Sequence, residues 1–150
     1  MILAEALNLR ADLQKRIAQV KERINDNVKV QEGDEPIEAP QELFKELDDL
    51  FAQLQEIIYR INKTNMAAVI DGKTLTEWIA ARDVLKYKIA AYRGAINNSL
   101  IKSDRYSRNE IRFVRTIDAA DIQKKADKMA KEYRELDIKI QQANWATELA

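Results

Sequence analysis

The sequence predicts an all-α protein of four long helices, with a small β-hairpin or two-stranded element in the connections. Two observations favour this fold class. Apolar residues recur alternately every three and four positions in four separate stretches, which is the spacing of one helix face. The 150 residues are 46% hydrophobic and 33% charged, with 3 Gly and 2 Pro, a composition typical of amphipathic helices. We therefore expect antiparallel coiled-coil hairpins or a bundle, in a single helical domain over residues 1–150.

Four apolar stripes place the helices at about residues 2–28, 41–63, 75–98 and 119–143. The first stripe contains Leu3, Leu7, Leu13, Ile17, Val20, Ile24 and Val28. The second contains Leu43, Leu47, Leu50, Leu54, Ile58 and Ile61, widened by Phe44, Phe51 and Ile57. The third contains Leu75, Trp78, Leu85, Ile89, Tyr92 and Ile96, and the fourth contains Ile122, Ala126, Met129, Tyr133, Leu136 and Ile140. Such stripes bury against partner helices at shallow crossing angles.

The helix starts carry their own signals. Pro40 suits the first position of the second helix. Thr74 and Glu77 have the spacing of a capping box before the third helix. Asp118 can cap the fourth helix, with Asp121 supporting its first turn. These signals agree with the starts that the stripes predict.

Irregular or β connections separate the helices at residues 29–40, 64–74 and 99–118. Asn62, Thr64 and Asn65 are expected to form caps and turns at the end of the second helix. Asp71 and Gly72 predict the tight turn of a very short hairpin.

Two of these connections have opposite charge. Residues 29–42 carry one lysine and five carboxylates, and residues 101–117 carry five basic and two acidic residues. In the second segment, Ile111, Phe113 and Val114 predict a short strand. We hypothesise that the two segments pair as a small two-stranded element, within one subunit or between subunits.

The acidic connection contains Glu32, Gly33, Asp34 and Glu35. Its carboxylates could hold Ca²⁺ or Mg²⁺ through oxygen ligands, but their spacing does not fit an EF-hand loop. The other interpretation is a turn in which Gly33 adopts positive φ and the acids face arginines or a helix N-terminus. We favour the turn and predict no metal site.

Arg10 and Arg82 fall at seam positions where an aliphatic residue is expected. A guanidinium there needs carboxylate partners, since an unpaired buried charge is costly. The candidate partners are Glu5, Asp12, Asp83, Asp127 and Asp137. Such a polar layer could line an anion site. We favour the alternative that it fixes helix register and oligomer state.

The basic connection mixes arginines with aromatic rings, through Arg105, Tyr106, Arg108, Arg112 and Arg115. This mixture is typical of nucleic-acid surfaces, where Arg contacts phosphate and rings stack on bases. The net charge of the chain is zero, however, and the patch is small. We therefore favour contact with the acidic connection or a neighbouring subunit over nucleic acid.

Several segments together resemble one bacterial family of uncharacterised helical proteins, often labelled "septicolysin". They are AEALNLRADLQKRI, VQEGDEP, INKTN, GKTLTE, RYSRNEIRFV and ELDIKIQQANW, and the resemblance runs from residue 2 to residue 149. It implies a helical fold of unassigned function. The label itself implies a thiol-activated pore-forming toxin. This chain departs from that label, since it has no cysteine, shows no secretion signal and is short for that toxin class.

The chain contains no cysteine and no histidine, which excludes thiol catalysis, Ser-His nucleophiles and the commonest metal ligand. The pairs Glu46/Asp49 and Glu132/Glu135 have the i, i+3 spacing that all-helical nucleotide hydrolases use to hold Mg²⁺. With no apolar run long enough for a membrane span and no signal peptide, we expect a cytoplasmic protein without a membrane partner.

Together these features predict a self-associating helical structural or interaction protein without catalytic residues or cofactors. Its expected partner is itself, in a homo-oligomer, and a further protein partner is left open. Two alternatives remain: a metal-dependent nucleotide hydrolase of the all-helical type, and a weak nucleic-acid-binding protein that uses residues 102–115.

Overall fold

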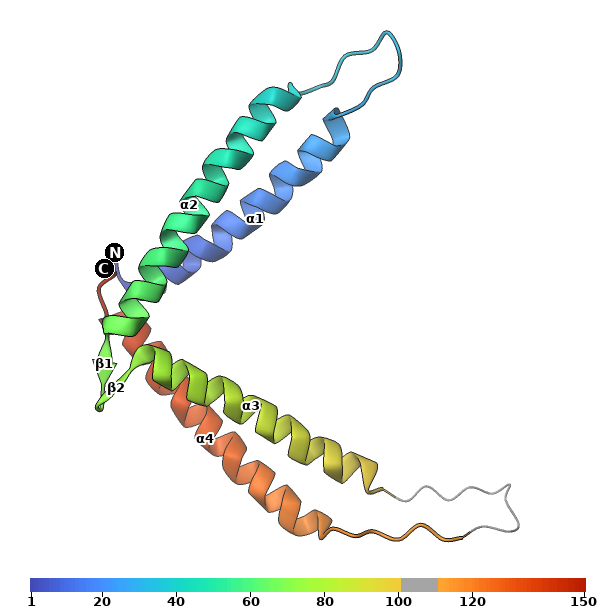
Figure 1. Cartoon of the computed structure of the whole chain (residues 1–150), viewed down its shortest axis with the longest axis vertical. Coiled ribbons are helices and arrows are strands. Elements are labelled where there is room, and N and C mark those ends of the chain that lie inside the picture. The colour runs from blue at the N-terminus through green and yellow to red at the C-terminus, as the bar shows by residue number, and fades with distance from the viewer. Residues whose placement is uncertain (101–110) are drawn as a thin grey trace. The chain divides into compact units, whose positions relative to one another are not determined.

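The computed structural model describes residues 1–100 and 111–150. This part of the chain contains the helices α1 (Leu3–Asn27), α2 (Pro40–Ala67), α3 (Leu75–Asn98) and α4 (Ala119–Ala146), and the strands β1 (Val69–Ile70) and β2 (Lys73–Thr74). Helix α1 pairs with α2 and α3 pairs with α4, each pair antiparallel (Figure 1). The prediction of an all-α protein with paired helices and a small two-stranded element is confirmed.

Two compact units make up the described chain. Unit 1 consists of Met1–Leu75 and Gln141–Ala150, and unit 2 consists of Thr76–Ile140. No helix in the described ranges is both long enough and apolar enough to cross a membrane.

The core of unit 1 is the seam between α1 and α2. Large side chains that are almost fully buried line it, namely Leu3, Leu13, Leu50 and Ile61. The buried positions of α1 keep the three-and-four spacing to the helix end, where Asn27 is buried and Val28 is exposed. The buried stripe of α1 therefore ends at Asn27, one residue before its predicted end at Val28. A half-buried Arg10 also lies in this seam.

A two-residue hairpin ends unit 1 before α3. Strands β1 and β2 are antiparallel, with Val69 opposite Thr74 and Ile70 opposite Lys73. Asp71 has φ 49° and Gly72 has φ 78°, the two positive φ angles of a type I′ turn. The predicted Asp-Gly turn is confirmed.

The last residues of the chain complete unit 1. The backbone N–H of Leu3 donates to the carbonyl of Thr147 at 2.8 Å, and that of Leu149 donates to Met1 at 2.9 Å. Arg60 Nε donates to the carbonyl of Ala150 at 2.9 Å. The N-terminal and C-terminal segments thus lie side by side.

Helix α2 continues to Ala67, four residues beyond its predicted end at about residue 63. Asn62, Thr64 and Asn65 are therefore helical, and the prediction that they cap the helix is wrong. The physical reason is a contact remote in sequence. Thr64 is buried, its hydroxyl donates to the carbonyl of Arg60 at 2.8 Å, and it accepts from the backbone N–H of Ala150 at 2.9 Å.

The start of α4 follows its sequence signal. The backbone N–H of Asp121 donates to Oδ1 of Asp118 at 3.1 Å, so the predicted cap is confirmed. Pro40 occupies the start of α2, also as predicted.

The prediction of a short strand at Ile111, Phe113 and Val114 is wrong. Residues 111–116 have no regular secondary structure. These apolar side chains are exposed, so no neighbouring strand in the described residues stabilises an extended pair. Residues 29–39 form no strand either, and the expected pairing of 29–40 with 101–117 is not formed in the described part of one chain. Residues 101–110 of that prediction lie outside the described ranges.

Candidate functional site

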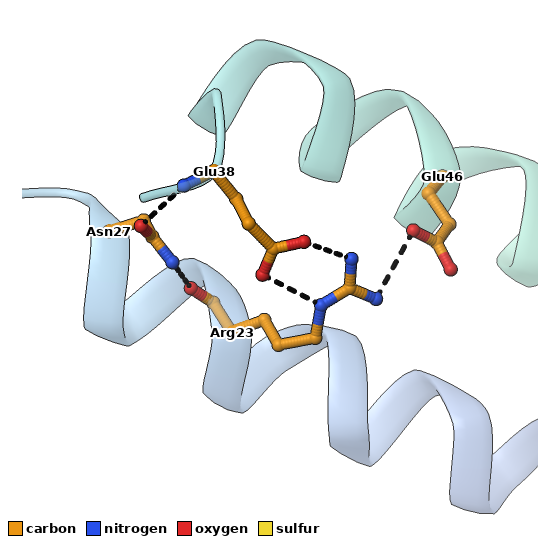
Figure 2. A network of polar contacts seen from close by, with 4 residues as sticks. All are labelled: Arg23, Asn27, Glu38 and Glu46. Carbon is orange, nitrogen blue, oxygen red and sulfur yellow. Dashed lines mark hydrogen bonds and ion pairs between the residues drawn. The ribbon is translucent and has the colours of Figure 1, made fainter. Parts of the chain in front are cut away.

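A cluster of polar contacts closes the connection between α1 and α2 (Figure 2). Arg23 on α1 donates to both carboxylate oxygens of Glu38, with Nε at 3.0 Å from Oε2. Its Nη1 lies 3.4 Å from Oε2 of Glu46 on α2. The hydrogen bond from Arg23 lowers the pKa of the Glu38 carboxyl, and the same bond raises the pKa of Arg23. The contacts of Arg23 with Glu38 and Glu46 fix the point at which the chain returns to α2.

Asn27 supplies a second link to the same connection. Its side-chain amide donates to the carbonyl of Arg23 at 2.8 Å and accepts from the backbone N–H of Glu38 at 2.9 Å. Because Asn27 is buried, both bonds are shielded from water. Residues 28–37 are consequently held at both ends, at Asn27 and Glu38.

Between these anchors, the acidic connection is a turn. The backbone N–H of Asp34 donates to the carbonyl of Gln31 at 3.0 Å, and Gly33 has φ +92°. Glu32, Asp34 and Glu35 are exposed. Within residues 1–100 and 111–150, no group of three or more Asp or Glu is placed to hold a metal ion.

Arg82 lies in the seam of unit 2, between α3 and α4. Its Nε donates to Oδ1 of Asp83 at 3.0 Å, and its Nη1 donates to Oδ1 of Asp137 at 2.9 Å. Burial lowers the pKa of Arg82, but the hydrogen bonds to the two carboxylates outweigh burial and leave the pKa raised. Nearby, Nζ of Lys139 lies 4.2 Å from the centre of the Trp78 ring.

The other members of the predicted polar layer do not join this cluster. Asp127 is exposed and accepts from Gln123 Nε2 at 2.8 Å. Arg10 belongs to unit 1, where no ion pair of its guanidinium with the described residues is found. The role in register and oligomer state stays a prediction for all five residues, since the described contacts do not test it.

The basic connection is described in part. Arg115 Nε donates to the carbonyl of Ser99 at 2.9 Å, which links the end of α3 to the segment before α4. Arg112 is exposed. Arg105, Tyr106 and Arg108 lie outside the described residues.

An open groove of about 470 Å³, not predicted from the sequence, lies between α3 and α4. Its floor is apolar, formed by Ile89, Ala90, Ala130 and Tyr133. Its rim is basic, formed by Lys86, Arg93 and Arg134, and no carboxylate lines it. Two alanines open the space, because a larger side chain at either position would fill it. We call this the basic groove.

The carboxylate pairs of the hydrolase alternative meet basic side chains. Glu46 contacts Arg23, and Asp49 lines a surface groove together with Arg16 and Lys45. Glu135 lies 3.9 Å from Nζ of Lys131.

A family model matches residues 10–149, and its family has no known function. The chain belongs to the DUF6847 family. It is also similar to a solved protein, described as a functionally unknown conserved protein from Corynebacterium diphtheriae. That structure has a TM-score of 0.92 and 44% identity, covering 100% of this chain and 99% of the other. A search of curated proteins found no match.

In this DUF6847 chain, two features escaped sequence reasoning. Asn27 continues the three-and-four spacing of α1, so its position signalled burial although its side chain is polar. Lys86 and Arg93 are seven residues apart and border the α3 stripe, a signal for one basic edge. Arg134 joins them from α4, and this meeting depends on the pairing of the two helices.

Proposed function

We propose that this protein is a self-associating helical interaction protein whose partner is a second copy of the chain. One observation carries the proposal: α3 is apolar on two opposite faces, and α4 covers one of them. An apolar face of a helix normally buries against a partner, so a helix with two apolar faces is expected to have two partners. Within the described residues, the outward face of α3 has no cover.

The outward face of α3 has the spacing of a coiled-coil seam. It consists of Ala80, Val84, Tyr87, Ala91 and Gly94, at alternating intervals of four and three. Val84 is 63% exposed and Tyr87 is 74% exposed. Isolated exposed apolar residues are ordinary, but a continuous stripe marks a contact surface. We call it the outer stripe.

A second copy fits the outer stripe, because that copy carries the same stripe. If two α3 helices cross antiparallel about a two-fold axis, Val84 of each copy lies opposite Tyr87 of the other. Ala80 then lies opposite Ala91, and these small side chains allow the helices to approach closely. Such an isologous contact closes on itself as a dimer.

Helix α2 supports the same conclusion independently. Besides the buried seam, it carries Phe44, Phe51 and Ile58, which are seven residues apart and partly exposed. Seven-residue spacing places them in one line along the helix. This second line gives α2 an apolar edge beyond the one that α1 covers.

The test is the mass of the untagged protein by native mass spectrometry and sedimentation. We expect wild type to have an integer multiple of the mass of one chain, and Val84→Asp to shift toward the monomer. Ile138→Asp is the matched control, since Ile138 is 57% exposed on α4, between the charged residues Asp137 and Lys139. A monomeric wild type at all accessible concentrations, or equal effects of the two substitutions, overturns the proposal.

A further inference from the structure

The basic groove combines two properties that select its occupant. Its floor of Ala90 and Ala130 is apolar and open, and its rim carries the positive charges of Lys86, Arg93 and Arg134. None of the three forms an ion pair with a carboxylate among residues 1–100 and 111–150. A groove of this kind suits an apolar side chain flanked by carboxylates.

The acidic connection of the same chain has that complementary pattern. Ile37 is 98% exposed, although isoleucine is among the residues most often buried. Three exposed carboxylates precede it, on Glu32, Asp34 and Glu35. Three negative charges beside one apolar side chain thus match three positive charges around one apolar floor.

The connection is also held ready for binding. Arg23 and Asn27 fix its return at Glu38, one residue after Ile37. Fixing a segment before it binds reduces the entropy lost on association.

We propose that the acidic connection of one copy binds in the basic groove of a second copy, with Ile37 on the alanine floor and the carboxylates facing the basic rim. The inference rests on the proposed self-association and names a contact apart from the outer stripe. Each copy carries one acidic connection and one groove. A two-fold dimer therefore makes the contact twice.

The first test changes Ile37 alone. Ile37→Asp is expected to raise the dissociation constant of the dimer roughly tenfold or more, because the contact would bury a charge on an apolar floor. Ile138→Asp introduces the same change on another exposed surface and should leave the constant unchanged. Since Ile37 is almost wholly exposed, its replacement does not disturb the fold of one chain.

The decisive test reverses charges. One variant carries Glu32→Lys, Asp34→Lys and Glu35→Lys, and a second variant carries Lys86→Glu, Arg93→Glu and Arg134→Glu. Each alone places like charges together and should associate more weakly than wild type. A one-to-one mixture restores opposite charges at both contacts, so its mixed dimer should regain the wild-type dissociation constant.

Cysteine cross-linking assigns the contact to two copies, since the chain has no native cysteine. Ile37→Cys and Ala90→Cys in one chain should yield a disulfide-linked dimer on oxidation. A disulfide within one chain, or no disulfide, overturns the inference.

The remaining outcomes separate the two proposals. A monomeric wild type overturns both. If wild type is a dimer that Val84→Asp weakens, but charge reversal and mixing have no effect, the groove inference fails and self-association stands. A copurified small anion seen as an added mass that Arg93→Glu removes, with the dimer unchanged, also overturns the inference.

Discussion

Nη1 of Arg82 lies 2.9 Å from Oδ1 of Asp137, and this ion pair joins α3 to α4 within unit 2. Both side chains are partly shielded, whereas the second partner, Asp83, is more exposed and lies on the same helix as Arg82. Asp137 therefore links two helices, whereas Asp83 contacts its neighbour on the same helix.

Asp137→Ala should lower the free energy of unfolding of unit 2 by about 1 kcal/mol, the range for a partly exposed charged hydrogen bond. Asp83→Ala should cost less, since no interhelical contact is lost. The two tryptophans make this measurable, because Trp78 lies in unit 2 and Trp145 in unit 1. In a Trp145→Phe background, urea unfolding followed by fluorescence reports on unit 2. Equal losses for both variants would contradict the prediction.

Glu38 should give unit 1 a pH-dependent stability. The pKa of its carboxyl is lower in the folded chain than in the unfolded chain, because Arg23 donates to the ionised form. The stabilisation is then fully present above about pH 4.3, the ordinary Glu value, and is lost as the pH falls through the lowered folded pKa. Glu38→Gln should reduce the stability at pH 7, and the difference from wild type should vanish in acid. Urea unfolding across pH measures it, with Glu22→Gln on the exposed side of α1 as control.

Asn27→Ala removes both hydrogen bonds that tie the end of α1 to Glu38. We expect a loss of about 1–2 kcal/mol in the unfolding free energy, since the part-buried backbone N–H of Glu38 loses its partner and the carbonyl of Arg23 loses one of its two donors. Asn25→Ala, at an exposed position of the same helix, should change it by less than about 0.5 kcal/mol. Chemical denaturation compares them. Alanine is the better helix former, so propensity alone would stabilise both variants, and equal losses for the two would contradict a specific role of the tie to Glu38.

Replacement of two glycines by alanine should change the stability of the chain in opposite directions. Gly33 has φ +92° and open space around an added Cβ, so Gly33→Ala costs backbone strain of about 1 kcal/mol without any clash. Gly94 is helical and also has open space, so Gly94→Ala should stabilise the chain by about 0.5–1 kcal/mol. Thermal unfolding of both variants decides this, and stabilisation by Gly33→Ala would mean that the turn does not need positive φ.

Local rules were sufficient for the presence and the starts of the helices, the Asp71–Gly72 turn and the caps at Pro40 and Asp118, but not for the end of α2. Each depends on residues close together in sequence, so spacing and capping chemistry predict it. The strand expected at residues 111–114 failed for the opposite reason. Its apolar residues suit a strand, but a strand also needs a neighbouring strand to pair with. The sequence pattern of one segment does not show whether such a neighbour exists.

The site was less predictable, because it depends on which side chains tertiary packing brings together. The sequence placed Arg82 in a seam and included Asp83 and Asp137 among its partners, but it also included Asp127, which lies on an exposed face. From the sequence alone, Glu38 was only one of the acidic residues in the connection between the first two helices. The hydrogen bond that Arg23, fifteen residues away, donates to Glu38 depends on how tightly the chain turns back onto α2.

The course of the chain through unit 1 bears on how it folds during synthesis. Thr64 is buried in α2, yet its hydroxyl accepts from the backbone N–H of Ala150, which is translated 86 residues later. Unit 2, the hairpin of α3 and α4, is therefore translated between the two parts of unit 1. Local pairing can begin as soon as each hairpin emerges, but unit 1 closes only after residues 141–150 have emerged. A ribosome stalled before residue 141 therefore displays α1 and α2 without the segment that completes them.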